Sequence, residues 1–362
     1  MLLRGIDRLG PAIGITVALI LGGLGIVPAA AAGGVSGGDN DRSLRVMTRN
    51  LDTGTDFGYL FGPGALPNPF AAVVATYQEV VASNPAGRAG RIADEIGATK
   101  PDLVALQEVD LWRLAPMTNP FQQTVTIDQL QQLLDALAAR GLHYSAAVTA
   151  QNLDVQVPTF TALGFVRFTD RDVILARSDQ PAGRMSLSNP HTQHFVHALV
   201  IPSALGPVTV LRSWESVDVT TRGHAARFIA THLEAFDPVS QMGQAHEIAT
   251  GPANTTLPLI LAGDMNSGPG SELFGYNQLL TDGFSDTWSA TKSGEPGFTW
   301  PLYLEDPTRP FPAGPFQRID LVLTRGDVAP QADSQVGLSP SSSGLFGSDH
   351  VGVFSDVRVP SS

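Results

Sequence analysis

Apolar runs and helical patterns alternate along the chain between residues 44 and 359. Some runs alternate with polar residues, as in a half-buried strand, and others are continuous, as in a strand buried on both faces. About ten strands and several helices fit a two-sheet α/β architecture in one domain. Strands are predicted at 44–50, 102–108, 171–177, 194–202, 208–214, 227–233, 257–261, 319–323 and 351–359, and helices within 88–102 and at 126–141, 240–250 and 271–280.

The segment 126–141 has the clearest helical pattern. Its apolar residues recur at helical spacing from Ile127 to Leu137. Thr126 and Gln129 can form a capping box at the start, and Gly141 is a stop signal at the end. Other segments are rich in turn residues and are predicted to be loops: 53–87, 149–170, 285–317 and 326–347.

Residues 1–32 have the order of a secretory signal peptide. Arg4 and Arg8 precede an apolar stretch of about 17 residues, and small residues follow it. We expect cleavage near Ala32, with Ala30 as the other small residue of the site. An uncleaved anchor is the alternative, although roughly 20 apolar residues are needed to span a bilayer comfortably. The sequence therefore predicts a secreted or cell-surface protein with a flexible lead-in at 33–43.

Composition narrows the possible chemistry. The chain has 362 residues and no cysteine, which excludes disulfides, thiolate metal sites and cysteine nucleophiles. Its formal net charge is -12, and Lys100 and Lys292 are its only lysines. Tight binding to long nucleic acid regardless of sequence depends on Lys and Arg, so this charge disfavours that function. Nothing in the sequence implies a stable protein partner, and we expect a monomer.

Residues that can bind a metal ion or transfer a proton stand at the ends of several predicted strands. Strand ends are where open α/β folds assemble their sites. Carboxylate and amide oxygens suit Mg²⁺ or Ca²⁺ rather than zinc, and imidazole titrates near neutral pH. A hard cation combined with acid/base histidines suits the attack of water on phosphorus. The residues are Asn50, Asp52, Glu108, His232, Asp264, Asn266, Asp320, Asp349 and His350.

Six short motifs resemble, in order, the signature motifs of the endonuclease/exonuclease/phosphatase superfamily, to which deoxyribonuclease I and neutral sphingomyelinases belong. Each motif is weak alone, but six in this order are specific. The segments MTRNLDTGTD, RDVILAR and SDHVGV are similar to an exported bacterial branch of the superfamily. The six motifs are TRNLD (48–52), LVALQEVD (103–110), ATHLE (230–234), LAGDMNS (261–267), QRIDLVL (317–323) and GSDHVGV (347–353).

The resemblance implies a four-layer α/β/β/α sandwich of two packed mixed sheets, with the site across the strand ends. By position, Glu108 matches the principal metal ligand, and Asn50, Asp52 and Asp349 would assist it. The implied cation is Mg²⁺, with Mn²⁺ or Ca²⁺ as alternatives. Asp52 has the strongest structural alternative, because its segment DTGTD also has the composition of a turn.

The resemblance also implies catalytic roles for five residues. His350 would activate water, and Asp320 would orient His350 through its other ring nitrogen. Asp264 and Asn266 would position the water and a phosphate oxygen. His232 would hydrogen-bond the phosphate or protonate the leaving group.

The predicted function is that of an exported, metal-dependent hydrolase of phosphate esters, with phosphodiesters favoured. A nuclease needs a basic or aromatic groove, and this chain is poor in lysine. A phospholipase of the sphingomyelinase type needs exposed apolar loops, for which residues 59–70 are a candidate. A phosphomonoesterase needs an arginine cluster around one phosphate. The alternatives from other classes are a non-catalytic binding module that kept the fold and a Ser-His-Asp hydrolase, which lacks a placed serine motif.

Overall fold

The computed structural model describes residues 42–61, 63–202, 206–271 and 274–361. The predicted signal peptide at 1–32 and most of the predicted lead-in at 33–43 therefore lie outside the described residues. Within the described ranges, every helix is too short or too polar to cross a lipid bilayer.

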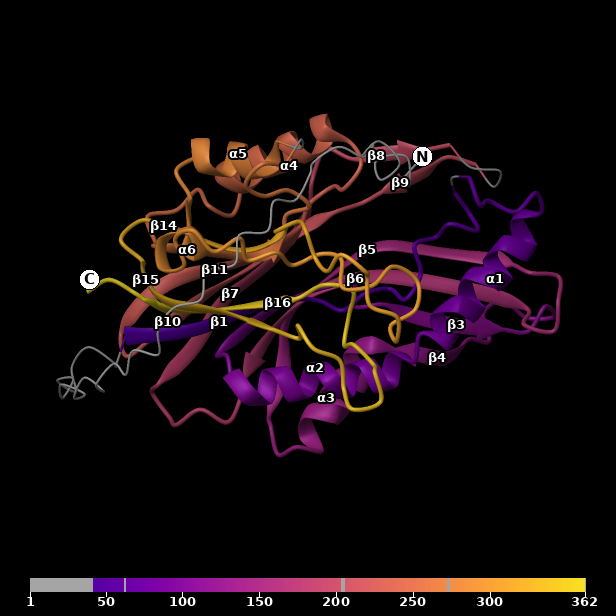
Figure 1. The fold of residues 1–362 in the computed structure, drawn as a ribbon, viewed down its shortest axis with the longest axis horizontal. Helices are drawn as coiled ribbons and strands as arrows, with labels where there is room; N and C mark the ends of the chain where they lie inside the picture. Colours follow the sequence, from indigo (N-terminus) through magenta and orange to yellow (C-terminus); the bar gives the residue numbers. More distant parts are fainter. Residues whose placement is uncertain (1–41, 62, 203–205, 272–273, 362) are drawn as a thin grey trace, which may run out of the picture.

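Two mixed β-sheets form the centre of the molecule (Figure 1). The first is 8-stranded with the order β15-β16-β1-β2-β6-β3-β4, and β5 also pairs with β6. Its strands are β1 (Ser43–Asn50), β2 (Leu103–Gln107), β3 (Leu111–Ala115), β4 (Thr124–Asp128), β5 (Tyr144–Pro158), β6 (Phe165–Arg177), β15 (Ala329–Val336) and β16 (Gly352–Arg358).

The second sheet is 6-stranded with the order β13-β14-β12-β11-β10-β7. Its strands are β7 (Met185–His194), β10 (Ser213–Thr221), β11 (His224–His232), β12 (Leu259–Asp264), β13 (Ser285–Asp286) and β14 (Asp320–Arg325). A small hairpin of β8 (Leu199–Ile201) and β9 (Val208–Val210) stands apart from both sheets.

Helices cover the outer faces of both sheets, as Figure 1 shows. Helices α2 (Pro85–Thr99) and α3 (Gln129–Ala138) pack on the first sheet, and α4 (Pro238–Thr250) and α5 (Gly275–Thr281) pack on the second. Helix α1 (Pro69–Ala82) covers β3 and β6, and the short α6 (Thr287–Thr291) follows β13. The predicted four-layer α/β/β/α sandwich is confirmed.

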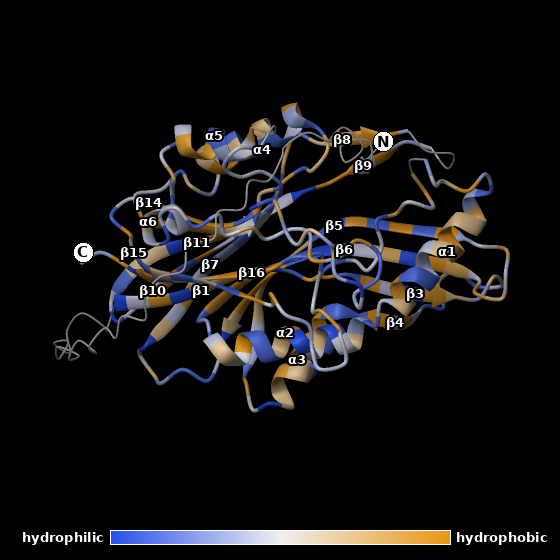
Figure 2. Cartoon of the chain, viewed as in Figure 1, coloured by the Kyte–Doolittle hydropathy of each residue, from blue (hydrophilic) through white to orange (hydrophobic). Residues whose placement is uncertain are grey.

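Strand β2 shows why its apolar run is continuous. Leu103 and Ala105 pack between the two sheets, whereas Val104 and Leu106 pack against α2 and α3. Successive side chains of a strand point to opposite faces, so a strand covered on both sides needs apolar residues at every position. The hydrophobic colouring along the inner strands in Figure 2 has this origin.

The predicted helix at 126–141 begins too early. Residues 124–128 form β4, which pairs with β3, and Thr126 Oγ1 donates to the Trp112 carbonyl at 3.1 Å. The helix α3 begins at Gln129, and Asp128 rather than Thr126 caps it by accepting from the Gln131 N–H at 3.3 Å. Strand pairing with a distant segment has overridden the local capping signal.

All four predicted loops contain regular structure, and segment 285–317 includes β13 and α6. Segment 53–87 includes α1, segment 149–170 includes most of β5, and segment 326–347 includes β15. The predicted strand at 194–202 instead divides between β7 and β8. The predicted strand at 208–214 is interrupted between β9 and β10. Arg212 lies in this interruption, and its side chain contacts His232 in the site described below.

Carboxylates are buried between the sheets beside this interruption. Glu215 on β10 and Asp172 on β6 are both almost fully buried. Ser213 Oγ donates to Glu215 Oε1 at 2.6 Å, and Asn152 Nδ2 donates to Asp172 Oδ2 at 2.8 Å. Burial, followed by the nearby charge of Asp170, raises the pKa of Glu215 to about 8.

We expect the free energy of unfolding to fall as the pH rises toward about 8, the pKa of Glu215 in the folded protein. The folded state holds the Glu215 proton more tightly than the unfolded chain does. The stabilising contribution is therefore complete below the ordinary pKa of 4.5 and is lost as the pH rises through about 8. Urea unfolding between pH 5 and 9 should show a shallower decline for Glu215→Gln than for the wild type. The exposed Glu295→Gln is the control, and equal slopes for all three proteins would contradict the expectation.

Candidate active site

Strand register brings the predicted residues to one edge of the sandwich. Parallel pairing of β1 with β2 aligns Asn50 with Gln107, so Glu108 follows directly beside Asn50. In the second sheet, His232 pairs with Asp264 and Asp264 pairs with Asp320. The sequence predicts each strand end separately, and the pairing register places the residues at these ends side by side within each sheet.

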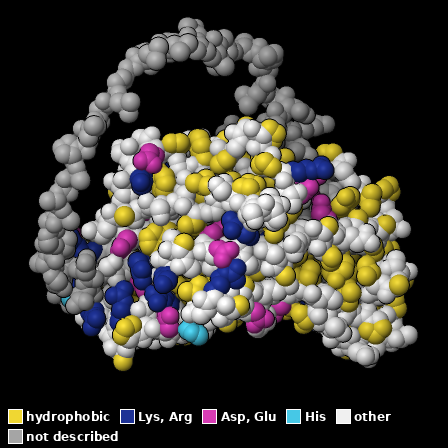
Figure 3. Space-filling model, turned by 60° about the horizontal axis from the view of Figure 1, so that its bottom comes forward, with side chains coloured by type: hydrophobic (Ala, Val, Ile, Leu, Met, Phe, Trp, Pro, Cys, Tyr) yellow, Lys and Arg dark blue, Asp and Glu magenta, His cyan; other side chains and the backbone are white. Residues whose placement is uncertain are grey.

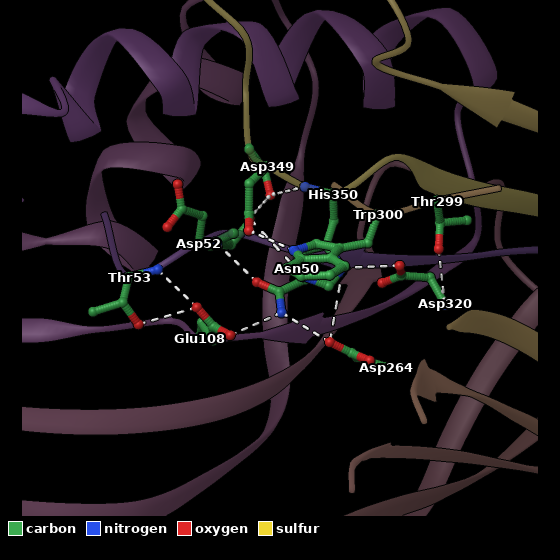
Figure 4. Close-up of polar contacts among 12 residues, drawn as sticks. Asn50, Asp52, Thr53, Glu108, Asp264, Thr299, Trp300, Asp320, Asp349 and His350 are labelled. Atoms are coloured by element: carbon green, nitrogen blue, oxygen red, sulfur yellow. Dashed lines mark hydrogen bonds and ion pairs between the residues drawn. The ribbon is translucent and has the colours of Figure 1, made fainter. Parts of the chain in front are cut away.

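Asn50 connects the two sheets. Its Nδ2 donates to Glu108 Oε1 at 3.0 Å on the first sheet and to Asp264 Oδ2 at 3.1 Å on the second (Figure 4). Its Oδ1 accepts from the Asp52 N–H at 2.8 Å, which fixes the orientation of the amide. The side chain is fully buried, so the predicted residues of the two sheets meet through it.

Glu108 is only partly buried, and its carboxylate is held from two sides. Besides Asn50, the N–H and Oγ1 of Thr53 donate to Glu108 Oε2 at 2.8 and 3.0 Å. Sequence reasoning missed Thr53, because a threonine in a turn-like segment carries no chemical signal. Glu108 has φ 54, in the left-handed region that side chains other than glycine rarely adopt, and such residues cluster at functional sites.

His350 and Asp320 form a close pair. His350 Nδ1 donates to Asp320 Oδ2 at 2.9 Å, because a carboxylate can only accept. The Asp320 N–H donates to Thr299 Oγ1 at 3.2 Å, and Arg49 donates to the His350 carbonyl at 2.6 Å. In the neutral ring these bonds leave Nε2 as the unprotonated nitrogen, which is the atom that could take a proton from water.

Asp349 lies on the Nε2 side of His350. Its Oδ1 is 3.9 Å from His350 Nε2, and its Oδ2 accepts from Trp300 Nε1 at 2.9 Å (Figure 4). Burial raises the pKa of Asp349 to about 7, with the charges of Asp52 and Glu108 adding to the rise and His350 opposing it. Trp300 therefore helps to fix the orientation of a site carboxylate.

His232 is held by an arginine that sequence reasoning missed. Arg212 Nη1 lies 2.8 Å from His232 Nδ1, and since guanidinium only donates, Nδ1 accepts. The proton of the neutral ring is therefore on Nε2, which lies 3.5 Å from Asp264 Oδ2. Burial, followed by the charge of Arg212, lowers the pKa of His232. Of the two implied roles, this geometry favours a hydrogen bond to phosphate.

Asn266 follows Asp264 in a tight turn. The Asn266 N–H donates to Asp264 Oδ1 at 2.9 Å, and its Nδ2 donates to the Leu233 carbonyl at 2.9 Å. The residue has φ 48, and asparagine tolerates this left-handed conformation well. The turn brings Asn266 close to the end of the His232 strand, where its side chain is only partly buried.

Asp52 lies close to the site, but other groups occupy its carboxylate. Arg88 Nη1 donates to Asp52 Oδ2 at 3.0 Å, and the hydroxyl of Tyr303 donates to the same oxygen. The Gly54 N–H donates to Oδ1 at 2.5 Å. With both oxygens engaged, the geometry favours the structural alternative for Asp52 over metal binding.

The remaining carboxylates fit a bound cation. Asp320 Oδ1 is buried without a hydrogen-bond partner. Burial, followed by the charge of Asp320, raises the pKa of Asp264 to about 7. Burial alone would lower the pKa of His350, but the charges of Asp320, Asp349 and Asp264 outweigh it and raise this pKa. The site thus has an excess of negative charge that a divalent cation would offset.

Two groups of side chains could hold such an ion. The predicted group is Asn50, Asp52, Glu108 and Asp349, of which Asn50, Glu108 and Asp349 remain because the Asp52 carboxylate is engaged by Arg88 and Tyr303. Asp264, Asp320 and His350 have ligand atoms within 4.8 Å of one another, as no other described set of three such residues does. In that second group His350 Nδ1 is already committed to Asp320, which fits proton transfer better than ligation.

Comparisons with known proteins agree with the fold. A sequence model of the endonuclease/exonuclease/phosphatase family matches residues 81–350. A search of curated proteins finds no match. Among solved structures, an endonuclease/exonuclease/phosphatase from Beutenbergia cavernae is 25% identical with a TM-score of 0.51, and the match covers 88% of this chain and 72% of that chain.

Two further structures share the fold at lower identity. The mannosyl-6-phosphatase Bt3783 of Bacteroides thetaiotaomicron is 14% identical with a TM-score of 0.53, covering 87% of this chain and 99% of that chain. D. rerio TDP2, in complex with a single-strand DNA product, is 16% identical with a TM-score of 0.51, covering 88% and 100%. The family match extends over most of the chain and includes the candidate residues from Glu108 to His350, whereas Asn50 and Asp52 precede it. The chain belongs to the endonuclease/exonuclease/phosphatase family, whose members are phosphoester hydrolases that generally depend on divalent metal ions.

Proposed function

We propose that this protein is an exported, Mg²⁺-dependent phosphodiesterase. The observation that carries the proposal is the His350–Asp320 pair, whose Nε2 side faces Asp349. When bound, a divalent cation supplies charge screening for the phosphoryl oxygens. Glu108, Asp349 and Asn50 are the residues that would hold it.

The side chains of the site divide the reaction between them. His350 takes a proton from water at Nε2, and Asp320 stabilises the resulting imidazolium through Nδ1. The water oxygen forms the new bond to phosphorus, the bond to the leaving oxygen breaks, and that oxygen takes up a proton from solvent. His232 donates Nε2–H to a phosphate oxygen, while Asp264 and Asn266 orient the water and the phosphate.

The arginines near the site favour a diester over a monoester. A phosphomonoester dianion is best held by several arginines. Arg88 is committed to Asp52, and Arg49 is paired with Glu95 at 2.8 Å. Of the described arginines, Arg212 is the one that contacts a predicted catalytic side chain, and a single guanidinium matches the single charge of a diester.

Arg212→Met tests the positioning of His232. Without the donor at Nδ1, the His232 ring can adopt the other tautomer and turn its N–H away from the phosphate. We expect kcat/KM to fall by roughly 10- to 100-fold, the size of the loss that follows a misplaced catalytic group. Arg212→Lys should recover part of the loss, and ¹⁵N chemical shifts of the imidazole should show the change of tautomer. Unchanged shifts and rates in Arg212→Met would exclude this role.

The substrate class can be tested in one panel. The protein is incubated with Mg²⁺, Mn²⁺ or EDTA and with plasmid DNA, RNA, sphingomyelin, bis(p-nitrophenyl) phosphate or p-nitrophenyl phosphate, and His350→Ala controls for contaminating hydrolases. We expect hydrolysis of the diester that requires metal and exceeds hydrolysis of the monoester. A faster monoester reaction would favour a phosphomonoesterase, and no metal-dependent hydrolysis at all would favour a binding module.

A further inference from the structure

Two hairpin turns and the start of α1 meet at one end of the molecule. We call this end the apolar tip; it consists of residues 116–123 between β3 and β4, residues 159–164 between β5 and β6, and Phe70. Gln156 Nε2 donates to the Pro120 carbonyl at 3.0 Å, which ties the two hairpins together. The rings of Phe70 and Phe160 meet edge to face at 4.8 Å.

The apolar tip exposes aromatic side chains that the core does not use. Phe121 is 90% exposed and Phe160 is 65% exposed. Phe160 also has φ 57, a left-handed backbone conformation that glycine or asparagine would adopt with less strain than phenylalanine. Apart from its edge contact with Phe70, the Phe160 ring is exposed, and its strained turn does not require an aromatic residue, which points to a contact outside the chain.

A separate hydrophobic cluster supports the apolar tip. Trp112 on β3 and Phe168 on β6 pack with their ring centroids 4.6 Å apart, and Tyr77 of α1 packs on Trp112 at 5.9 Å. Strand β6 continues past the end of β2 to reach this region, because β2 pairs only with the Val173–Ala176 part of β6. The turns are therefore held on a rigid extension of the first sheet.

The apolar tip is almost free of charge. Charged residues make up 15% of the chain, yet the segments 63–78, 114–127 and 155–166 contain none. Asp154 and Arg167, which flank the third of these segments, form a salt bridge through Arg167 Nε at 2.8 Å. In Figure 3, hydrophobic and uncharged side chains cover much of the end that carries α1, β3 and β4 in Figure 1.

We propose that the apolar tip docks the protein on a zwitterionic lipid surface by inserting Phe121 and Phe160. Projecting aromatic side chains on two adjacent turns suit insertion into an interface, whereas a protein partner is more often met by a flat or concave patch. Uncharged polar neighbours such as Thr118 and Asn119 can hydrogen-bond lipid headgroups. Because the turns have no Lys or Arg, binding should not depend on anionic lipid.

A single fluorescent label tests the insertion directly. The chain has no cysteine, so Phe121→Cys accepts one environment-sensitive dye at the apolar tip, and Val239→Cys on α4 is the matched control at another exposed apolar position. With phosphatidylcholine vesicles the dye at position 121 should shift to the blue, and the dye at position 239 should not. No shift at 121, or equal shifts at both positions, would overturn the proposal.

A partition measurement gives the second test. The Phe121→Ser/Phe160→Asn double variant keeps a residue that tolerates φ 57, and its binding to phosphatidylcholine vesicles should be weaker by roughly tenfold or more for each phenylalanine removed. The Val239→Ser/Leu338→Ser control should bind like the wild type. All proteins keep the same N-terminus, so its contribution is common to them, and thermal melting confirms folding.

Salt and lipid composition decide between the possible partners. Binding to phosphatidylcholine that is equal in low and high salt supports the proposal. Binding that requires anionic phosphatidylglycerol contradicts it, because electrostatic attraction would then dominate. Concentration-dependent dimers that disappear in the double variant, without vesicle binding, would assign the apolar tip to a second copy of the chain instead.

Discussion

His350→Ala is expected to reduce turnover of a phosphodiester by about 10² to 10⁴, the usual contribution of a positioned general base. The variant loses both ring nitrogens: Nδ1, which donates to Asp320, and Nε2, which faces Asp349. The effect should appear in kcat more than in KM, since the base acts on water and not on the substrate. Steady-state kinetics on bis(p-nitrophenyl) phosphate measure both parameters.

The matched control is His246→Ala. His246 is exposed on α4 and contacts Asp282 at 3.3 Å, a residue that is not among the candidate site residues. Its loss should leave kcat unchanged. If His350→Ala kept the wild-type rate while remaining folded, another group would have to activate the water, and the assignment of His350 would be wrong.

Asp320→Asn is expected to have an effect of similar size through a different cause. The asparagine amide can donate to His350 Nδ1, which would force the ring proton onto Nε2 and remove the free lone pair. In serine proteases the equivalent change costs about 10⁴ in kcat because it fixes the wrong tautomer. Since Asp320 acts through His350, we expect about 10² to 10⁴ here as well.

The double variant His350→Ala/Asp320→Asn separates this mechanism from simple structural damage. If Asp320 works only by orienting His350, the double variant should be no slower than His350→Ala alone. Losses that multiply would show that the two residues act independently. Asp333→Asn, which changes another buried aspartate remote from the site, measures the cost of losing a buried charge in general.

The convergence of the candidate residues could be predicted from the sequence where a strand carries each residue to its place. His232, Asp264 and Asp320 follow or begin apolar runs, and register alone then brings them side by side. Asp52 differs because its surroundings come from elsewhere in the chain. Arg88 arrives from α2 and Tyr303 from a segment without regular structure, and neither contact has a local pattern.

The role of Arg212 also could not be predicted from the local sequence. It lies where a predicted strand is interrupted, and an arginine beside a strand usually indicates only a solvated surface. Its role depends on the distance to His232, which no periodicity encodes. Helix α1 was missed for a related reason: Pro, Gly and Asn before it suggest a loop, whereas Asn68 in fact caps the helix by accepting from the Phe70 N–H at 3.0 Å.

The hydrogen bonds of Asn50 to both sheets affect how the protein should lose activity on heating. The Asn50 amide joins Glu108 to Asp264, so each sheet carries about half of the candidate site. Loosening of the interface between the sheets would separate these halves before either sheet unravels. When the protein is warmed, the catalytic rate should therefore fall at a lower temperature than the circular dichroism signal. Turnover would then report separation of the two sheets before secondary structure is lost.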